Sequence, residues 1–219
     1  MDANRKRLYA VVLAGFCAFL DLYAPQPMLP MLARVFHTTP AGASLLVSVS
    51  TLAVALAAPF VGFVADRLGR KLVIVPATVL VAVPTLLAAT AGSLNQLLFW
   101  RTLQGIFTPG IFAVTVAYIN EEWREGTGAA MAAYVTGTVL GGFTGRMLAA
   151  VVSMRWSWQL AFVLLGVLNL AGAAAIHFWM PAGRRFTGPR HSNAVQLSRH
   201  LRNPPLLATY TAGFCLLLP

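Results

Sequence analysis

The sequence has little charge and few of the residue types on which enzymes rely. Only 10% of its 219 residues are charged, whereas a soluble domain carries about 25%. With 58% hydrophobic residues, this composition excludes an ordinary soluble domain and indicates a membrane protein. The two cysteines, Cys17 and Cys215, lie in apolar segments without metal-type spacing. The sequence contains no nucleotide-binding loop or nucleophile constellation, so it predicts no enzyme, no metal and no cofactor.

Acidic residues are especially scarce, with 6 Asp and Glu against 16 Lys and Arg and a formal charge of +10. This excess could indicate nucleic-acid binding, but the basic residues lie between apolar runs rather than on one soluble face. With the amino terminus inside, the outer loops hold only Arg34 and Arg155, and the cytoplasmic segments hold most of the others. Cytoplasmic loops of membrane proteins carry such an excess, which predicts a cytoplasmic amino terminus.

Six apolar segments exceed the ~20 residues needed to cross a bilayer. They are residues 8–31, 41–65, 72–92, 97–119, 126–152 and 157–180. A seventh runs from Leu206 to Pro219 and is too short to cross. The sequence therefore predicts an all-α, multi-pass membrane helix bundle with six transmembrane helices and the start of a seventh.

The same pattern predicts three parts of the chain. Residues 1–180 form a six-helix unit, residues 181–205 a basic cytoplasmic linker, and residues 206–219 the truncated start of a second unit. For the linker, a basic surface against anionic lipid is the alternative.

A run of both charge signs, Gly62 to Lys71, separates the second and third apolar segments. Charged residues of a short loop cannot lie in hydrocarbon, so the run is predicted to be a turn at the membrane surface. Gly62 and Gly69 are expected to give the turn its backbone freedom. Asp66 is expected to cap the next helix or to pair with nearby basic residues, which makes the loop a rigid polar clasp.

This run resembles the G-x-L-a-D-r-x-G-r-k signature of the major facilitator superfamily. The positions in register are Gly62, Ala65, Asp66, Arg67, Gly69, Arg70 and Lys71, whereas Val64 replaces the usual Leu. An ordinary positive-inside hairpin rich in Gly and Arg is the alternative.

The resemblance implies a secondary active transporter with two inverted three-helix repeats per six-helix half. Its drug:proton antiporter and arabinose-efflux-like branch implies proton-coupled efflux of a small molecule by alternating access, in the bacterial inner membrane. The implied partners are substrate, protons, lipid and a second half or second copy, with no nucleic acid. The alternative is a truncated six-helix fragment that does not transport and acts as an interaction partner.

Three charges lie inside the apolar segments: Asp21, Arg101 and Arg146. A lone carboxylate in a bilayer is costly and needs a partner, so an ion pair or triad among these residues is a possible arrangement. In the alternative, both arginines extend to the outer interface and Asp21 alone is internal. Asp21 is predicted to take and release a proton. The run from Arg101 to Gly105 resembles the family motif R-x-x-q-G, which implies a role for Arg101 in proton coupling.

Polar residues at helical spacing follow Arg101 along the fourth segment, and they predict a cavity or a helix contact. Under the resemblance, the first helix of each repeat lines the substrate path. The predicted substrate contacts are Tyr23, Gln26, Gln104, Tyr118 and Arg146. Asn169 in the sixth segment is interpreted as a satisfied packing residue rather than a ligand.

Small residues recur at every fourth position in two segments, which favours close helix packing. Gly137, Gly141 and Gly145 form this seam in the fifth segment, and Ser44, Ser48 and Thr51 belong to a similar seam in the second. The glycine run partly resembles the fifth-helix motif of drug:proton antiporters, but Gly142 replaces its proline and Arg146 its last glycine.

Overall fold

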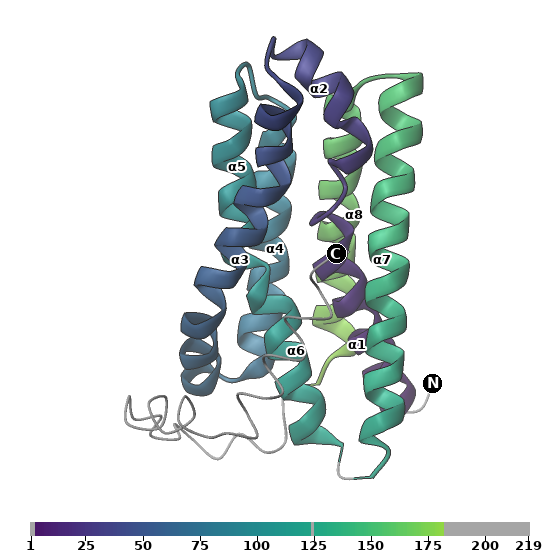
Figure 1. The fold of residues 1–219 in the computed structure, drawn as a ribbon. Helices are drawn as coiled ribbons and strands as arrows, with labels where there is room; N and C mark the ends of the chain where they lie inside the picture. The colour runs from purple at the N-terminus through teal and green to yellow at the C-terminus, as the bar shows by residue number, and fades with distance from the viewer. Residues whose placement is uncertain (1–2, 124, 182–219) are drawn as a thin grey trace. The chain divides into compact units, whose positions relative to one another are not determined.

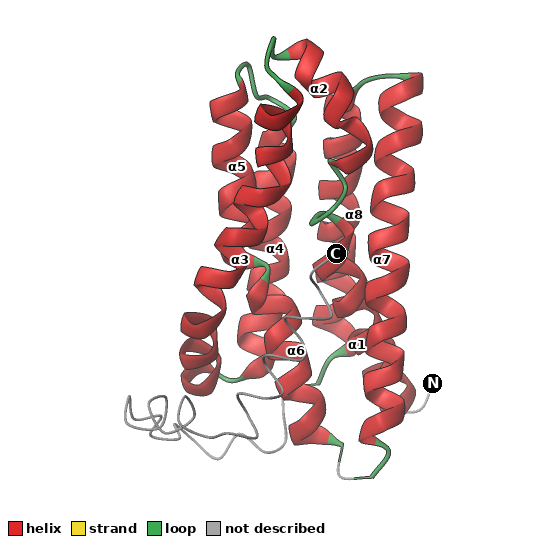
Figure 2. Cartoon of the chain, viewed as in Figure 1, coloured by secondary structure: helices red, strands yellow, loops and turns green. Residues whose placement is uncertain are grey.

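In the computed structural model, residues 3–123 and 125–181 are described, and they form helices joined by short turns (Figures 1 and 2). These residues contain no strand, so the prediction of an all-α fold is confirmed. The predicted segment 206–219 and nearly all of the predicted linker lie outside the described residues.

The helices follow one another with few residues between them. In chain order they are α1 (Ala3–Leu20), the short 3₁₀ helix η1 (Gln26–Met28), α2 (Leu29–Val35), α3 (Pro40–Leu68), α4 (Arg70–Ala88), α5 (Leu94–Phe107), α6 (Pro109–Glu122), α7 (Thr127–Arg155) and α8 (Trp158–Trp179). Threonine or serine caps α3, α5 and α8, where the side chains of Thr39, Ser93 and Ser157 accept hydrogen bonds from backbone N–H groups three residues later.

Five helices among the described residues are long and apolar enough to cross a membrane: α3, α4, α5 with α6 taken together, α7 and α8. The first predicted segment differs, because α1 ends at Leu20 and an irregular turn precedes η1. Pro25, Pro27 and Pro30 lack the N–H groups that would continue a helix, which accounts for the break. The first predicted segment, residues 8–31, is therefore divided among α1, a turn, η1 and the start of α2.

The predicted charged loop is almost entirely helical. Asp66 and Arg67 lie in the last turn of α3, and Arg70 lies in the first turn of α4. Only Gly69 separates the two helices, and its φ of 95° is a conformation that favours glycine. The expectation that Gly62 gives the turn its backbone freedom is wrong. This residue lies inside α3, and an added Cβ would meet no atom within 4 Å.

The helices pack in pairs that fit the predicted repeat. α1 lies along α7, α3 along α5 and α6, and α4 along α8. A repeat that relates α1, α3 and α4 to α5 with α6, α7 and α8, in that order, exchanges the α1–α7 pair with the pair of α3 and α5 with α6. The same repeat leaves the α4–α8 pair unchanged. In Figure 1, α1, α3, α6 and α7 lie in front of α4 and α8. We call the surface that these four front helices form the open face.

Two apolar clusters fill the bundle, one near each of its ends. One includes Ala18, Val81 and Ile111, and the other includes Leu20 and Leu97. Each span, with α5 and α6 counted as one, contributes residues to both clusters. The buried polar residues described below lie at the boundary between the two clusters.

The glycine seam of α7 lies directly against α1. A Cβ added to Gly137, Gly141 or Gly145 would collide with the backbone carbonyl oxygen of Val12, Phe16 or Leu20, respectively. The two backbones are thus close enough that only glycine fits. In contrast, Ser44, Ser48 and Thr51 of α3 are exposed, so these three residues form no comparable seam among the described residues.

This packing predicts different effects for two adjacent glycines. Gly141→Ala should lower the thermal stability of the detergent-solubilised protein, because overpacking costs about 1–3 kcal/mol. Gly142→Ala should leave stability unchanged or raise it, because the nearest atom to its added Cβ is Phe19 Cβ at 4.0 Å and Ala is favoured over Gly within helices. Equal melting temperatures for the two variants would contradict the inferred contact.

Candidate functional site

A fully buried arginine holds the break in the first span. Arg101 on α5 has 0% exposure. Its Nη1 donates to the backbone carbonyl of Asp21 (3.0 Å), its Nη2 to that of Leu22 (2.7 Å), and its Nε to that of Leu46 on α3 (3.0 Å). At the end of α1, backbone carbonyl groups lack N–H donors from a following helical turn, and the guanidinium of Arg101 supplies those donors.

The carboxylate of Asp21 is buried just beyond α1, with 3% exposure. Its Oδ2 accepts hydrogen bonds from the hydroxyl of Thr85 on α4 (2.8 Å) and from the side-chain amide of Asn169 on α8. Its Oδ1 and the Oδ1 of Asn169 have no hydrogen-bond partner among the described residues. A carboxyl group in this environment is a candidate for proton exchange.

Side chains connect Arg101 to the carboxylate indirectly. Arg101 Nη1 donates to Gln104 Oε1, and Gln104 Nε2 donates to Thr85 Oγ1 (2.6 Å). The structure shows no direct ion pair between the carboxylate and Arg101 within its described part. The five side chains of Asp21, Thr85, Arg101, Gln104 and Asn169, which we call the polar core, thus come from α4, α5, α8 and the turn after α1.

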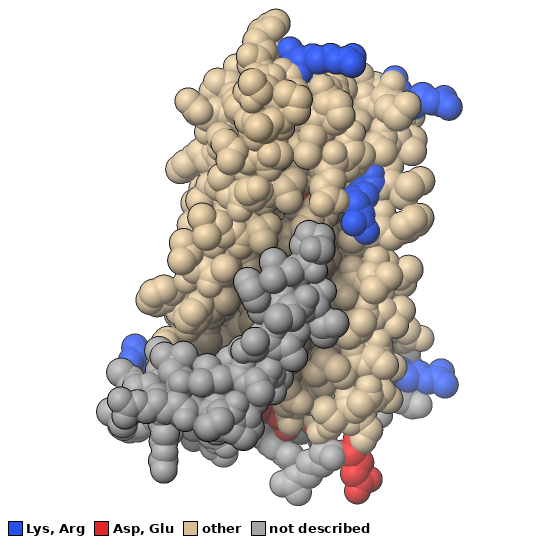
Figure 3. Space-filling model, in the orientation of Figure 1, with Lys and Arg blue, Asp and Glu red and all other residues tan. Residues whose placement is uncertain are grey.

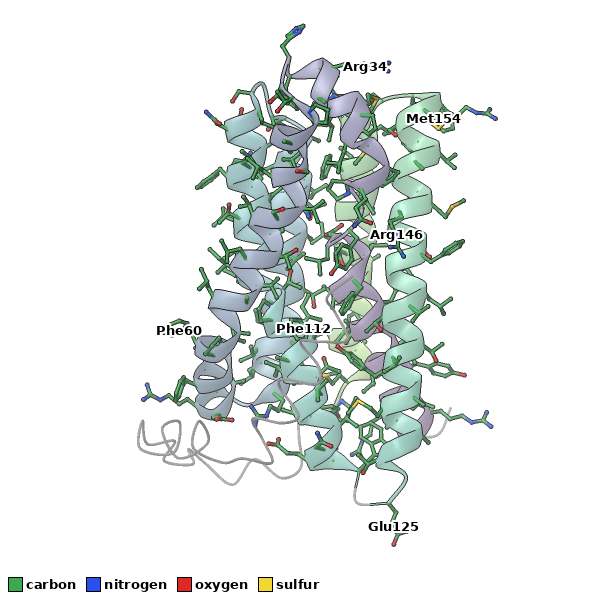
Figure 4. The ribbon with its side chains drawn as sticks, in the orientation of Figure 1. Arg34, Phe60, Phe112, Glu125, Arg146 and Met154 are labelled. Atoms are coloured by element: carbon green, nitrogen blue, oxygen red, sulfur yellow. The ribbon has the colours of Figure 1, made fainter. Side chains whose placement is uncertain are left out.

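The other predicted site residues lie apart from the polar core. Tyr118 is buried, and its hydroxyl has no hydrogen-bond partner among the described residues. Tyr23 is half-buried, Gln26 is exposed, and Arg146 extends from α7 on the open face (Figure 4). Arg146 is therefore not part of a triad with Asp21 and Arg101, and the idea that Arg101 extends to the interface is also wrong.

Sequence reasoning missed two members of the polar core. Thr85 was not predicted, and Asn169, interpreted as a satisfied packing residue, donates its side-chain amide to Asp21. The available signal was spacing along the predicted spans. Both residues lie near the middle of apolar segments, at the depth where a partner for Asp21 is required.

A second polar cluster lies where α3 and α6 end. Arg70 contacts Asp66 Oδ1 (2.7 Å) and forms a bidentate pair with Glu121, from Nη2 to Oε1 (2.7 Å) and from Nε to Oε2 (3.2 Å). Arg7 on α1 lies 3.7 Å from Glu122 on the same end of α6. The resulting charge pairs connect the ends of α3 and α4 to the end of α6.

A bundle whose described part has five apolar spans and a buried polar core is the architecture of a multi-pass membrane protein. The sequence model of the Major Facilitator Superfamily matches residues 11–218. The chain belongs to this superfamily, as its resemblance in the run from Gly62 to Lys71 indicated.

Curated relatives agree with this assignment. The chain is 33% identical over 218 residues to an uncharacterized MFS-type transporter, YybF, of Bacillus subtilis, covering 97% of the chain and 54% of the relative. It is 34% identical over 214 residues to the inner membrane transport protein YnfM of Escherichia coli, covering 95% of the chain and 51% of the relative. The chain thus spans about half the length of these relatives.

Solved structures show the same fold. A bacterial homologue of the human lysosomal transporter Spinster, in an inward-facing and unoccupied conformation, matches with a TM-score of 0.75 at 18% identity. The match covers 91% of this chain and 47% of that chain. At this identity the likeness establishes the fold alone.

The geometry of Arg101 predicts that a conservative change is severe. Arg101→Lys keeps the charge, but a lysine ammonium lacks the planar fork of N–H groups with which the guanidinium reaches three separate carbonyls. Some of these buried acceptors would therefore lose their donors. We expect a loss of at least about 2 kcal/mol in stability, measured as thermal unfolding of the detergent-solubilised chain. Arg155→Lys, at the exposed end of α7, is the matched control and should melt as the wild type does. A stable Arg101→Lys variant would contradict the structural role.

Proposed function

We propose that this chain forms the amino-terminal half of a secondary active transporter that couples proton movement to efflux of a small molecule by alternating access. The carboxyl of Asp21, held in a polar core at mid-depth, is the observation that carries the proposal. The second half is a further segment or a second copy, in keeping with relatives of about twice this length.

The polar core can accommodate a proton on Asp21 without moving its heavy atoms. The single hydroxyl proton of Thr85 has two acceptors in reach, Asp21 Oδ2 (2.8 Å) and the Val81 carbonyl (2.7 Å). With Asp21 ionised, Thr85 donates to the carboxylate. With Asp21 protonated, the carboxyl donates to Thr85, whose proton turns to Val81. Gln104 donates to the Thr85 oxygen in both states.

Names among the relatives support the direction and the location. Some relatives at about 30% identity are putative multidrug resistance proteins, MdtD, of Salmonella, and YnfM is an inner membrane protein. We accordingly propose efflux from the bacterial cytoplasm across the inner membrane, with a cytoplasmic amino terminus. The alternative of a non-transporting fragment draws no support from relatives that are named as transporters.

Proton exchange at Asp21 can be observed in the 219-residue chain itself. Infrared difference spectra across a pH titration should show a protonated carboxyl band that Asp21→Asn removes. Glu125→Gln, which changes an exposed acid in the turn before α7, should retain the band. The absence of any titrating band that is specific to Asp21 would overturn its assignment.

Coupling is tested by proton flux in liposomes. Two forms are reconstituted: the chain alone, and the chain fused to the second half of the B. subtilis relative. The form that shows substrate-dependent proton movement is then used to test the variants. Asp21→Asn should abolish proton-linked transport while the protein still inserts, because no side chain at that depth can then exchange the proton. Unchanged coupling in this variant would exclude the proposed role of Asp21.

The charge pairs around Arg70 are proposed to act as a conformational clasp. The predicted members of the clasp are Gly62, Asp66, Arg67, Gly69, Arg70 and Lys71, and Glu121 joins them in the structure. A clasp that holds one state must break in the other, so its pairs bias the equilibrium between two conformations.

Two arginines of this cluster provide a matched comparison. Arg70→Gln removes both contacts and should change the transport rate several-fold, because a charge-assisted bidentate pair contributes about 1.5–3 kcal/mol. Arg67→Gln removes an exposed charge without a described partner and should change the rate little. Equal effects of the two changes would argue against the clasp.

A further inference from the structure

Arg146 of α7 places a positive charge on the open face. Its side chain is exposed, and the structure gives it no hydrogen bond or ion pair within the described residues. It precedes Arg155, the last residue of α7, by two and a half helical turns or ~14 Å. Figure 3 shows a basic side chain at mid-height among uncharged residues, and Figure 4 places Arg146 there.

An unpaired arginine at this depth is unfavourable without a function. On insertion scales, an arginine at the centre of a spanning helix costs about 2.5–3.5 kcal/mol. Arg146 is also not needed for packing, because its side chain is exposed, whereas neighbouring Gly145 makes the contact with α1. Charged residues of this kind typically mark the path of a substrate or an ion.

The distribution of acids determines which charge the open face can bind. Asp21 is buried, and its Oδ2 already accepts two hydrogen bonds. The other described acids, Asp66, Glu121, Glu122 and Glu125, lie at or beyond the ends of α3 and α6. A cation at mid-depth would therefore meet no accessible carboxylate among the described residues, whereas an anion would meet the guanidinium of Arg146.

The surroundings of Arg146 are aromatic and apolar. One turn earlier on α7, a Cβ added to Gly142 would lie 4.0 Å from Phe19 Cβ on α1. Phe19 in turn packs edge to face on Phe112 of α6, with 6.4 Å between ring centroids. The charge of Arg146 is thus close to an aromatic surface, formed by Phe19 and Phe112, that the apolar part of a ligand can contact.

We propose that Arg146 binds the oxyanion of an amphipathic organic acid, and that such acids are the substrate class of this transporter. The guanidinium offers two parallel N–H groups, which match a carboxylate in a bidentate pair. The proposal rests on the proposed transport function and adds its substrate class. A phospholipid phosphate has the same oxyanion chemistry, so the experiment separates these two sources.

Three probes with one apolar body test the charge preference: phenylbutyrate, phenylbutyramide and phenylbutylamine. Calorimetric titration of the chain in maltoside micelles should show the acid binding about tenfold more tightly than the amide or the amine. Arg146→Gln should abolish that preference, and Arg146→Lys should retain part of it. Arg155→Gln, an exposed change on the same helix, should leave it intact.

Each remaining result decides against the proposal. Equal binding of the three probes, or tighter binding of the amine, overturns an anionic substrate class. If phospholipid co-purifies with the wild type but not with Arg146→Gln, and the acid does not bind, then Arg146 is a lipid-phosphate site. Asp21→Asn should still prefer the acid. This binding result is therefore independent of proton coupling, and loss of coupling alone leaves it unchanged.

Discussion

The structure depends on one guanidinium that binds the backbone of a broken helix. Where α1 ends, Asp21 and Leu22 are buried in the bundle, and Arg101 donates to the backbone carbonyls of both. Unpaired carbonyls in a hydrocarbon environment would cost several kcal/mol each. The same side chain also binds the carbonyl of Leu46, so it connects the break in the first span to α3 and α5. The position of the Asp21 carboxylate follows from this arrangement.

Close helix contacts bring the polar core within hydrogen-bonding range. Gly105, one residue after Gln104, lies so near the Ser50 carbonyl on α3 that a Cβ could not be accommodated. Ser50 also donates to the carbonyl of Arg101 (2.9 Å). On the other side, Gly172 of α8 lies against Cys17, one turn before Asp21. Small residues therefore set the distances at which the amide and guanidinium groups can reach the turn after α1.

The sequence was sufficient for the fold and for the two charges of the polar core, because long apolar segments and buried ionised groups are unusual. It was insufficient for Thr85. Thr78 and Thr115 also lie in apolar helices, Thr108 lies between α5 and α6, and like Thr85 each donates to the carbonyl four residues earlier. Only the packing of α4 beside the break shows which threonine also reaches a carboxylate. Likewise, the sequence did not predict that α3 extends to Leu68, because the charged residues Asp66 and Arg67 at its end were interpreted as part of a loop.

The proton site and the substrate site proposed here are separate but share a helix contact. Gly145, which precedes Arg146, packs on the carbonyl of Leu20, the last residue of α1. The next residue is Asp21, whose own carbonyl is bound by Arg101. Because three glycine contacts hold α7 against α1 at backbone distance, α7 cannot shift along α1 without a change at this turn. Under the proposed function, such a change would alter the hydrogen bonds of Asp21, and binding at Arg146 would be coupled to the carboxyl in this way.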